Sequence, residues 1–391
     1  MAPDELSFEI VPRFYITCFY AHEKDISGMQ EALSARLKDL PFQLDALTIQ
    51  ELEPFNYHAF HHLGFVRIDL KPLALPAPEP QVLFAVSQAI EELCNEYNTE
   101  SLHLICDSNN PPYAVNIATQ ASKDIEWSQE AILQYKKPLG KWIEFYSGQW
   151  PDYSDELYLS RVENNLSNRL SELHFIRFNS GFIFMPSTGF DQFMPYMDQY
   201  FIEQILRVRS LLYCYNLLND EIDSLNRRFP ELQKSPLAEI EKEIGRVEDL
   251  DRLIQELASR VFKERIINRR AHSKKVLNVC FDLFQIDLIS KEIEEKIVKL
   301  QQALSSEREE QQTRLSNQQK RWLLILNLLL GSQIAFTLRD NIKDQLSLAE
   351  DDLLILLLDL GVWGFVIIAA LVAVGGLLYT QLSKRISLPW G

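Results

Sequence analysis

The sequence predicts an α+β region at the N-terminus, long helices in the middle and two transmembrane helices at the C-terminus. The first hundred residues alternate between strand and helix patterns, the helical period prevails from about residue 195, and two apolar runs follow residue 320. We expect an α+β domain in residues 1–110, a mixed segment in 111–190, a long-helix bundle in 191–304, a polar stalk in 305–320, a first transmembrane helix in 321–339, an acidic external loop in 340–352, a second transmembrane helix in 353–383 and a basic cytoplasmic tail in 384–391.

The α+β region begins with a strand from Ser7 to Tyr20, which is rich in aromatic and β-branched residues. Asp25 can cap the helix that follows. The stretches LDALTIQEL and GFVRIDLK are typical of strands, Pro80 suits the first turn of a second helix, and SLHLICD predicts another strand. This strand–helix–strand–strand–helix–strand order resembles a ferredoxin-like unit, without any signature residue of that fold.

The mixed segment begins after the turn cluster DSNNPPY, which marks a possible domain boundary. The stretch YSDELYLSRVENNLSNRLSELHF predicts a helix. The stretch HFIRFNSGFIFMP predicts two short strands, joined by a tight turn around Asn179, Ser180 and Gly181.

The middle region predicts long helices. The first has a broad apolar face and ends before Pro230, and the second begins where Ser235 can act as a cap and Pro236 as the first helical residue. We expect these two helices to pack antiparallel. A seam from Ile286 to Leu304 could pack inside the domain or against another subunit. The basic cluster Lys263–Lys275 could bind a phosphate, but a solvated helix end is the simpler interpretation.

The stalk, residues 305–320, contains only one apolar residue, Leu315, so it has little to bury. The uncharged run from Trp322 to Leu338 follows and reaches about 25 Å as a helix, against roughly 30 Å of hydrocarbon in a bilayer. A second run, Leu360–Ser383, carries no charge.

The charges that flank the two runs predict the topology. Lys320 and Arg321 precede the first run, Lys384 and Arg385 follow the second, and the intervening loop is acidic, so both termini should be cytoplasmic in a cell membrane. The alternative is a buried or interfacial first helix followed by a single span.

Polar and small residues within the runs are the candidate site residues. Asn327, Ser332 and Gln333 could hold helices together or line a pore. Asp359 could be an interfacial acid or an acid at a pore mouth. A face of small residues favours close helix packing and a homo-oligomer, and consists of Ala369, Ala373 and Gly376.

Several functional classes are disfavoured. A net charge of −16 argues against a nucleic-acid partner, and the acidic N-terminus is unlike a secretory signal. The five scattered cysteines fit a reducing cytoplasm. His58, His61 and His62 have helical metal-site spacing, but Pro54 and Gly64 flank them, so a surface cluster is the simpler interpretation. Phosphate-binding and nucleophile motifs are missing, so we predict no cofactor and no enzyme activity.

The layout resembles that of CorA-type divalent-cation channels. The similarity consists of a cytosolic α/β domain, a helical stalk that enters the first span at KRWLLILNLLL, a second span and a basic tail at SKRI. The Gly-Met-Asn signature of that family is replaced by IAFTLRDN, so no selectivity or site is implied. The resemblance implies a cytosolic domain that assembles and is coupled to paired spans.

Two functions therefore remain open. The first is an ion channel or membrane-perturbing effector that is gated by a small ligand or a cytosolic protein. The second is a membrane-anchored scaffold that binds proteins without conduction.

Overall fold

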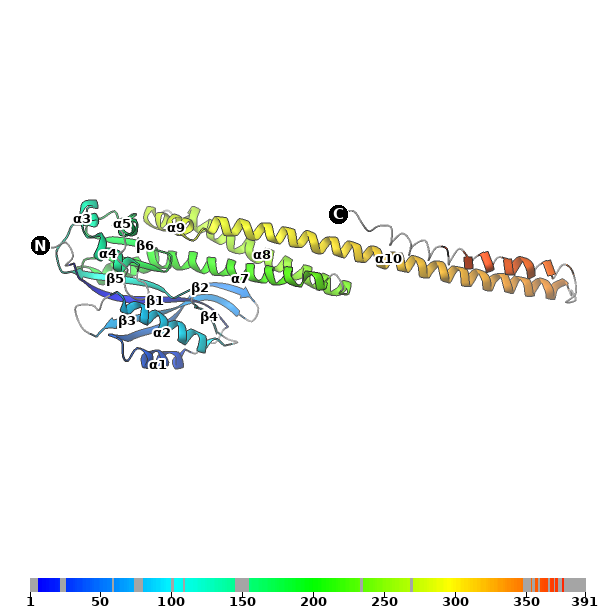
Figure 1. Cartoon of the computed structure of the whole chain (residues 1–391), viewed down its shortest axis with the longest axis horizontal. Coiled ribbons are helices and arrows are strands. Elements are labelled where there is room, and N and C mark those ends of the chain that lie inside the picture. Colours follow the sequence, from blue (N-terminus) through cyan, green and yellow to red (C-terminus); the bar gives the residue numbers. More distant parts are fainter. Residues whose placement is uncertain are drawn as a thin grey trace. The chain divides into compact units, whose positions relative to one another are not determined.

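The computed structural model (Figure 1) consists of two compact units, residues 1–228 with 246–300, and residues 229–245 with 301–391. The described residues are 6–21, 26–57, 60–73, 80–99, 102–107, 110–144, 155–232, 235–267, 270–346, 353, 356–357, 359–364, 366–368, 370–371 and 375.

The first unit, called the head, has the element order that the sequence predicts up to residue 105. The elements are β1 (Phe8–Tyr20), α1 (Ser27–Arg36), β2 (Phe42–Tyr57), β3 (Phe60–Pro72), α2 (Val82–Tyr97) and β4 (Leu102–Ile105). His61 and His62 lie in β3 and so point to opposite sides of a strand, whereas His58 lies outside the described residues. The helical metal-site spacing is therefore not realised by His61 and His62.

The sheet continues beyond the expected boundary near residue 110. Three further strands join it, namely β5 (Tyr113–Ala121), β6 (Leu173–Ile176) and β7 (Ser180–Phe184). The strand order is β2-β3-β1-β5-β7-β6, and β4 also pairs with β1. Strand β1 pairs with β5 over Phe8–Tyr15 and with β4 over Thr17–Tyr20, so the two strands share one edge of β1. Strands β5 and β7 are parallel, and β6 and β7 form the predicted hairpin.

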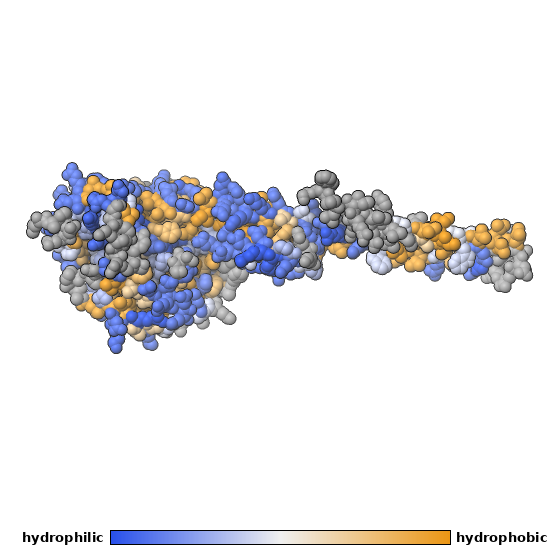
Figure 2. Space-filling model, in the orientation of Figure 1, coloured by the Kyte–Doolittle hydropathy of each residue, from blue (hydrophilic) through white to orange (hydrophobic). Residues whose placement is uncertain are grey.

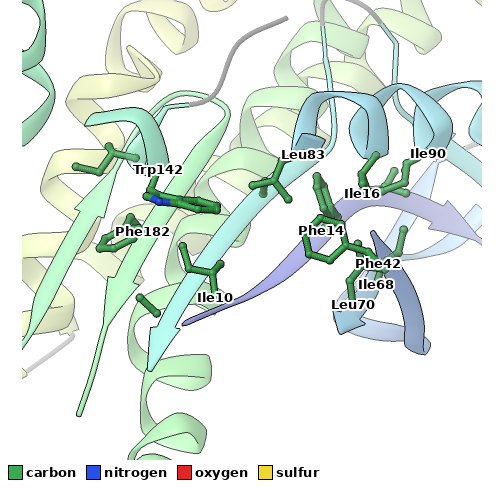
Figure 3. Packing of buried hydrophobic residues seen from close by; sticks show 14 of the residues in the cluster. Ile10, Phe14, Ile16, Phe42, Ile68, Leu70, Leu83, Ile90, Trp142 and Phe182 are labelled. Carbon is green, nitrogen blue, oxygen red and sulfur yellow. The ribbon is translucent and has the colours of Figure 1, made fainter. Parts of the chain in front are cut away.

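One face of the sheet forms the main hydrophobic core (Figure 3). Phe14 and Ile16 of β1 and Ile68 of β3 point to this face, where Leu83 and Ile90 of α2 cover them. The same core continues under α3 (Gln129–Gln134), α4 (Lys136–Ile143) and α5 (Asp155–Val162). Alternation along β1 therefore sends the side chains of Arg13, Tyr15 and Thr17 to the other face.

The other face of the sheet meets the helices that follow β7. These are α6 (Phe190–Met197), the five-residue π-helix η1 (Asp198–Ile202) and α7 (Glu203–Leu232). The Thr17 and Ser210 hydroxyls lie 3.4 Å apart and join β1 to α7. Phe201, Ile205, Val208, Leu212 and Leu225, which the sequence places on an apolar face, are all buried.

Two of the predicted helix boundaries are wrong. The helix expected over residues 153–175 ends at Val162, because Asn164 adopts a left-handed conformation with φ of 68° and the chain then turns into β6. The helix expected to end before Pro230 continues to Leu232. Pro230 lies two residues before the end of the helix, so the hydrogen bond that it removes belongs to the last turn.

Helices α8 (Leu237–Ile267), α9 (Ala271–Leu283) and α10 (Ile286–Leu346) complete the described elements up to residue 346. Within the head, an ion pair between Glu221 and Arg246 joins α7 to α8, as antiparallel packing requires. The Tyr215 hydroxyl lies 3.1 Å from the Ser290 hydroxyl and joins α7 to α10. The seam residues Ile286, Ile293, Ile297 and Leu300 are buried inside this unit, which favours the intramolecular alternative for this part of the seam.

Candidate functional site

The first candidate site is the C-terminal part of α10, which lies in the second unit. An 18-residue window of this helix has a mean hydropathy of 1.4, and none of the window is buried. Trp322 is 68% exposed and Leu329 is 64% exposed. Figure 2 shows hydrophobic residues at the surface over this part of α10. Within the described residues, α10 is the one helix long and apolar enough to cross a membrane.

The predicted polar residues of the first span lie on α10. Asn327 and Gln333 are exposed. The Ser332 hydroxyl donates a hydrogen bond of 2.7 Å to the Leu329 carbonyl. The backbone of α10 therefore supplies the acceptor for this hydroxyl. Asp359 forms an ion pair with Arg339. Ala369, Ala373 and Gly376 lie outside the described residues.

Two contacts pair the end of α10 with the segment that follows it. The first is the Arg339–Asp359 ion pair, and the second is an edge-to-face ring contact between Phe336 and Trp363, whose centroids are 5.8 Å apart. The earlier residue on α10, Phe336, contacts the later residue of the following segment, Trp363, and Arg339 contacts Asp359. The two helical segments therefore run antiparallel. We call this arrangement the C-terminal hairpin. No local pattern in the sequence predicts this pairing, because Arg339 and Asp359 are 20 residues apart in the chain.

The second candidate site is a cavity of about 540 Å³ in the head, which we call the sheet–helix cavity. Strands β1 to β3 supply one wall, and the segment from Pro195 to Leu206 supplies the other. The cavity lies on the sheet face opposite the main core. Its lining residues are Tyr15, Gln50, Glu51, Leu52, Phe65, Arg67, Pro195, Asp198, Gln199, Ile202, Glu203 and Leu206.

A ring of four charges lies at this cavity. The Asp69 carboxylate accepts hydrogen bonds of 2.9 and 3.0 Å from Arg67 Nε and lies 3.1 Å from Arg13 Nε. Asp198 accepts a 2.8 Å bond from Arg13 Nη1 and lies 3.6 Å from Arg67 Nη1. Arg13 and Asp69 are direct cross-strand partners on β1 and β3, so the sheet register builds half of this charge ring. Asp198, the first residue of the π-helix, completes it.

Burial shapes the electrostatics of the cavity wall. Burial raises the pKa of the Asp198 carboxyl, and the neighbouring guanidinium groups of Arg13 and Arg67 act in the opposite direction. Burial also raises the pKa of the Tyr15 hydroxyl well above its usual range, so this hydroxyl stays protonated at neutral pH. Among the described residues it has no hydrogen-bond partner. The Tyr15 hydroxyl is thus a buried, neutral group behind the cavity wall.

The composition of the wall suits a small organic cation. Three carboxylates, from Glu51, Asp198 and Glu203, line the cavity, against one lining cation, Arg67. The rings of Tyr15 and Phe65 meet edge to face at 5.6 Å and add an aromatic surface. Carboxylates beside aromatic rings are a favourable environment for an ammonium group.

A further cavity of about 450 Å³ in the head contains two histidines. His174 of β6 is 3% exposed, and its Nδ1 lies 3.2 Å from His272 Nε2 on α9. Burial lowers the pKa of His174 to about 3, helped by the positive charges of Arg169 and Lys275 and by the proximity of His272, and burial also lowers the pKa of His272. Both rings are therefore neutral at physiological pH. We call this cavity the histidine cavity.

These shifts predict acid sensitivity of the fold. Below pH 6.5 the unfolded chain binds a proton at His174 that the folded head does not bind until about pH 3, so stability is fully present above 6.5 and is lost as the pH falls. Between pH 7.5 and pH 5, His174 alone should lower the free energy of unfolding by about 2 kcal/mol. Urea unfolding of wild type and His174→Phe at both pH values measures this, and an equally steep loss in the variant would contradict the assignment.

Groups of three or more His, Cys, Asp or Glu side chains that could hold a metal ion do not occur in the described ranges. No protein-family model, no curated protein and no solved structure matches this chain.

Proposed function

We propose that this chain is an integral membrane protein that crosses the bilayer twice and holds a ligand-binding α/β head on the cytoplasmic side. The observation that carries the proposal is the apolar window of α10, none of which is buried. A soluble protein rarely leaves so large a contiguous apolar surface in water. Hydrocarbon is the environment that such a surface fits, and a helix satisfies its own backbone groups there.

The C-terminal hairpin supports a second crossing. The ion pair and the ring contact place the start of the second apolar run level with the end of the first. From that point the uncharged residues 360–383 are long enough to return across the bilayer. Pairing with Arg339 also gives Asp359 a partner at the interface, where an isolated carboxylate would be costly.

The sheet–helix cavity supports a binding role for the head. We propose a small organic cation as its ligand, because lining carboxylates outnumber lining cations and the rings of Tyr15 and Phe65 supply an aromatic surface. Asp198, Gln199 and Ile202 of the π-helix line the cavity, and α7 follows directly in the chain. π-Helical turns are frequent at functional sites. Ligand binding in this cavity would therefore act directly on the start of α7.

A conducting homo-oligomer is the second candidate. It is favoured by the exposure of Asn327 and Gln333 on an otherwise apolar helix surface, because lipid cannot satisfy these amides. Amide contacts between copies of the chain would satisfy them without conduction. An ion flux into liposomes that changes with Asn327→Leu would favour the conducting homo-oligomer. The absence of any ion flux would favour a membrane-anchored scaffold.

Labelling of engineered cysteines from outside intact cells tests the proposed topology. Cysteine at Gln345 should react with a membrane-impermeant maleimide, and cysteine at Ser387 should react only after the membrane is permeabilised. Cysteine at Leu315, which is 46% exposed in the stalk, serves as the cytoplasmic control. The five native cysteines are buried, so their background should be low. External reaction at Ser387 would replace the two-span topology by a single-span one.

A further inference from the structure

The histidine cavity brings together nitrogen and sulfur donors from distant parts of the chain. His174 and His272 are 98 residues apart in sequence. Their facing ring nitrogens are 3.2 Å apart, whereas two nitrogens bound to one tetrahedral ion at 2.0 to 2.1 Å are separated by about 3.3 Å. Met185 and Met197 line the same cavity, and each is 3% exposed. The two imidazoles are therefore spaced as a chelating pair beside two thioethers.

We propose that the histidine cavity binds one cuprous ion through His174 Nδ1 and His272 Nε2, with the thioether of Met185 or Met197 as a further ligand. Thioether sulfur is a soft ligand that selects Cu(I), and imidazole nitrogen also binds copper. Carboxylates and thiolates, the usual additional ligands of zinc, do not join the two histidines as a metal-binding group within the described residues.

Glu172 lies beside the first imidazole. Its Oε2 is 3.7 Å from His174 Nε2, which is beyond hydrogen-bond distance, so Nε2 has no hydrogen-bond partner among the described residues. In the tautomer that carries the His174 proton on Nε2, Nδ1 accepts the hydrogen bond from His272 Nε2. An ion would replace that hydrogen bond, and the His272 proton would move to Nδ1.

His272 can accept this change of tautomer. Its Nδ1 is buried and has no hydrogen-bond partner among the described residues, so no neighbouring group fixes which of its two ring nitrogens carries the proton.

The charges around the cavity favour an ion of low charge. Arg169 lines the cavity and is paired with Glu172 at 2.8 Å, and Lys275 lies near enough to lower the pKa of both histidines. A monovalent ion is repelled by these cations half as strongly as a divalent one. This difference adds to the thioether preference in favour of Cu(I) over Zn(II).

Competition with a chromophoric Cu(I) chelator tests the site in the full-length protein in detergent. Under reducing conditions the protein should remove one Cu(I) per chain from bicinchoninate, measured by the loss of the complex's absorbance. His272→Gln should weaken the affinity at least tenfold. Met185→Leu with Met197→Leu keeps the side-chain volume and should also weaken Cu(I) binding, because only the thioethers are removed.

Met194→Leu is the matched control, because Met194 lies on α6 and is buried but does not line the cavity. It should bind Cu(I) as the wild type does. Near-ultraviolet circular dichroism at 20 °C confirms that each variant is folded. The proposal is overturned if the chelator keeps all its copper, if His272→Gln binds unchanged, or if Met194→Leu weakens binding as much as the double methionine variant. The assignment to copper would also be overturned by a combination of two results. These are Zn(II) binding that is lost when either histidine is replaced, and Cu(I) binding that is unchanged when both methionines are replaced.

Discussion

Replacing Leu326 and Leu330 by arginine should prevent α10 from inserting into the bilayer. The two residues lie four positions apart on one helix face and are 53% and 49% exposed. Each arginine near the middle of a span costs about 2.5 to 3.5 kcal/mol, so the pair should disfavour insertion by about 5 to 7 kcal/mol, more than a thousandfold. A glycosylation acceptor placed in the loop of residues 340–352 reports insertion into microsomes, because only a translocated loop is modified.

Leu315→Arg is the matched control for this experiment. Leu315 is an exposed apolar residue of the same helix, but it lies in the polar stalk before the apolar run. Its replacement should leave the loop glycosylated as in the wild type. Equal glycosylation of the double arginine variant and the wild type would contradict the claim that the apolar surface of α10 drives its insertion into the bilayer.

Replacing Asp69 by alanine should produce the largest loss of stability in the head. Asp69 pairs with both Arg13 and Arg67, whose side chains are 13% and 18% exposed, so its removal leaves these two cations in a partly buried site with Asp198 as the one remaining carboxylate of the charge ring. Breaking a largely buried ion pair at one partner costs about 3 kcal/mol. The midpoint of thermal unfolding should fall by about 6 to 12 °C in a unit of this size.

Asp45→Ala is the control for Asp69→Ala. Asp45 pairs with Lys71 at 2.6 Å, but the side chains are 42% and 55% exposed. An exposed pair contributes less than about 1 kcal/mol, so this midpoint should move by no more than about 4 °C. Equal shifts in the two variants would show that the charge ring does not hold the sheet to the π-helix.

The strands and helices up to residue 105 could be predicted because each has a local pattern. Aromatic and β-branched residues mark β1, and helical spacing of Met29, Leu33 and Leu37 marks α1. Strand β5 was missed because its sequence, YAVNIATQA, has many small residues and is buried along most of its length, so no alternation appears. The left-handed Asn164, which ends the expected long helix, has no strong local signal either.

The candidate sites in the head could not be predicted, because they depend on long-range packing. Arg13 and Asp198 are 185 residues apart in sequence, and only the docking of the π-helix on β1 and β3 brings them together. His174 belongs both to the stretch that predicts a helix and to the stretch that predicts a strand, whereas in β6 it points away from Leu173 and Phe175 toward His272. In contrast, the apolar run of α10 is a local property of composition, which the sequence predicted directly.

The depth of α10 in a bilayer tests the central claim most directly. Nitroxide labels at Leu330 and at Leu315 lie about 22 Å apart along one continuous helix. In lipid nanodiscs, electron paramagnetic resonance should find the label at position 330 accessible to oxygen and shielded from a water-soluble nickel complex, with the reverse at position 315. Equal nickel accessibility at the two positions would contradict the claim that α10 crosses the membrane.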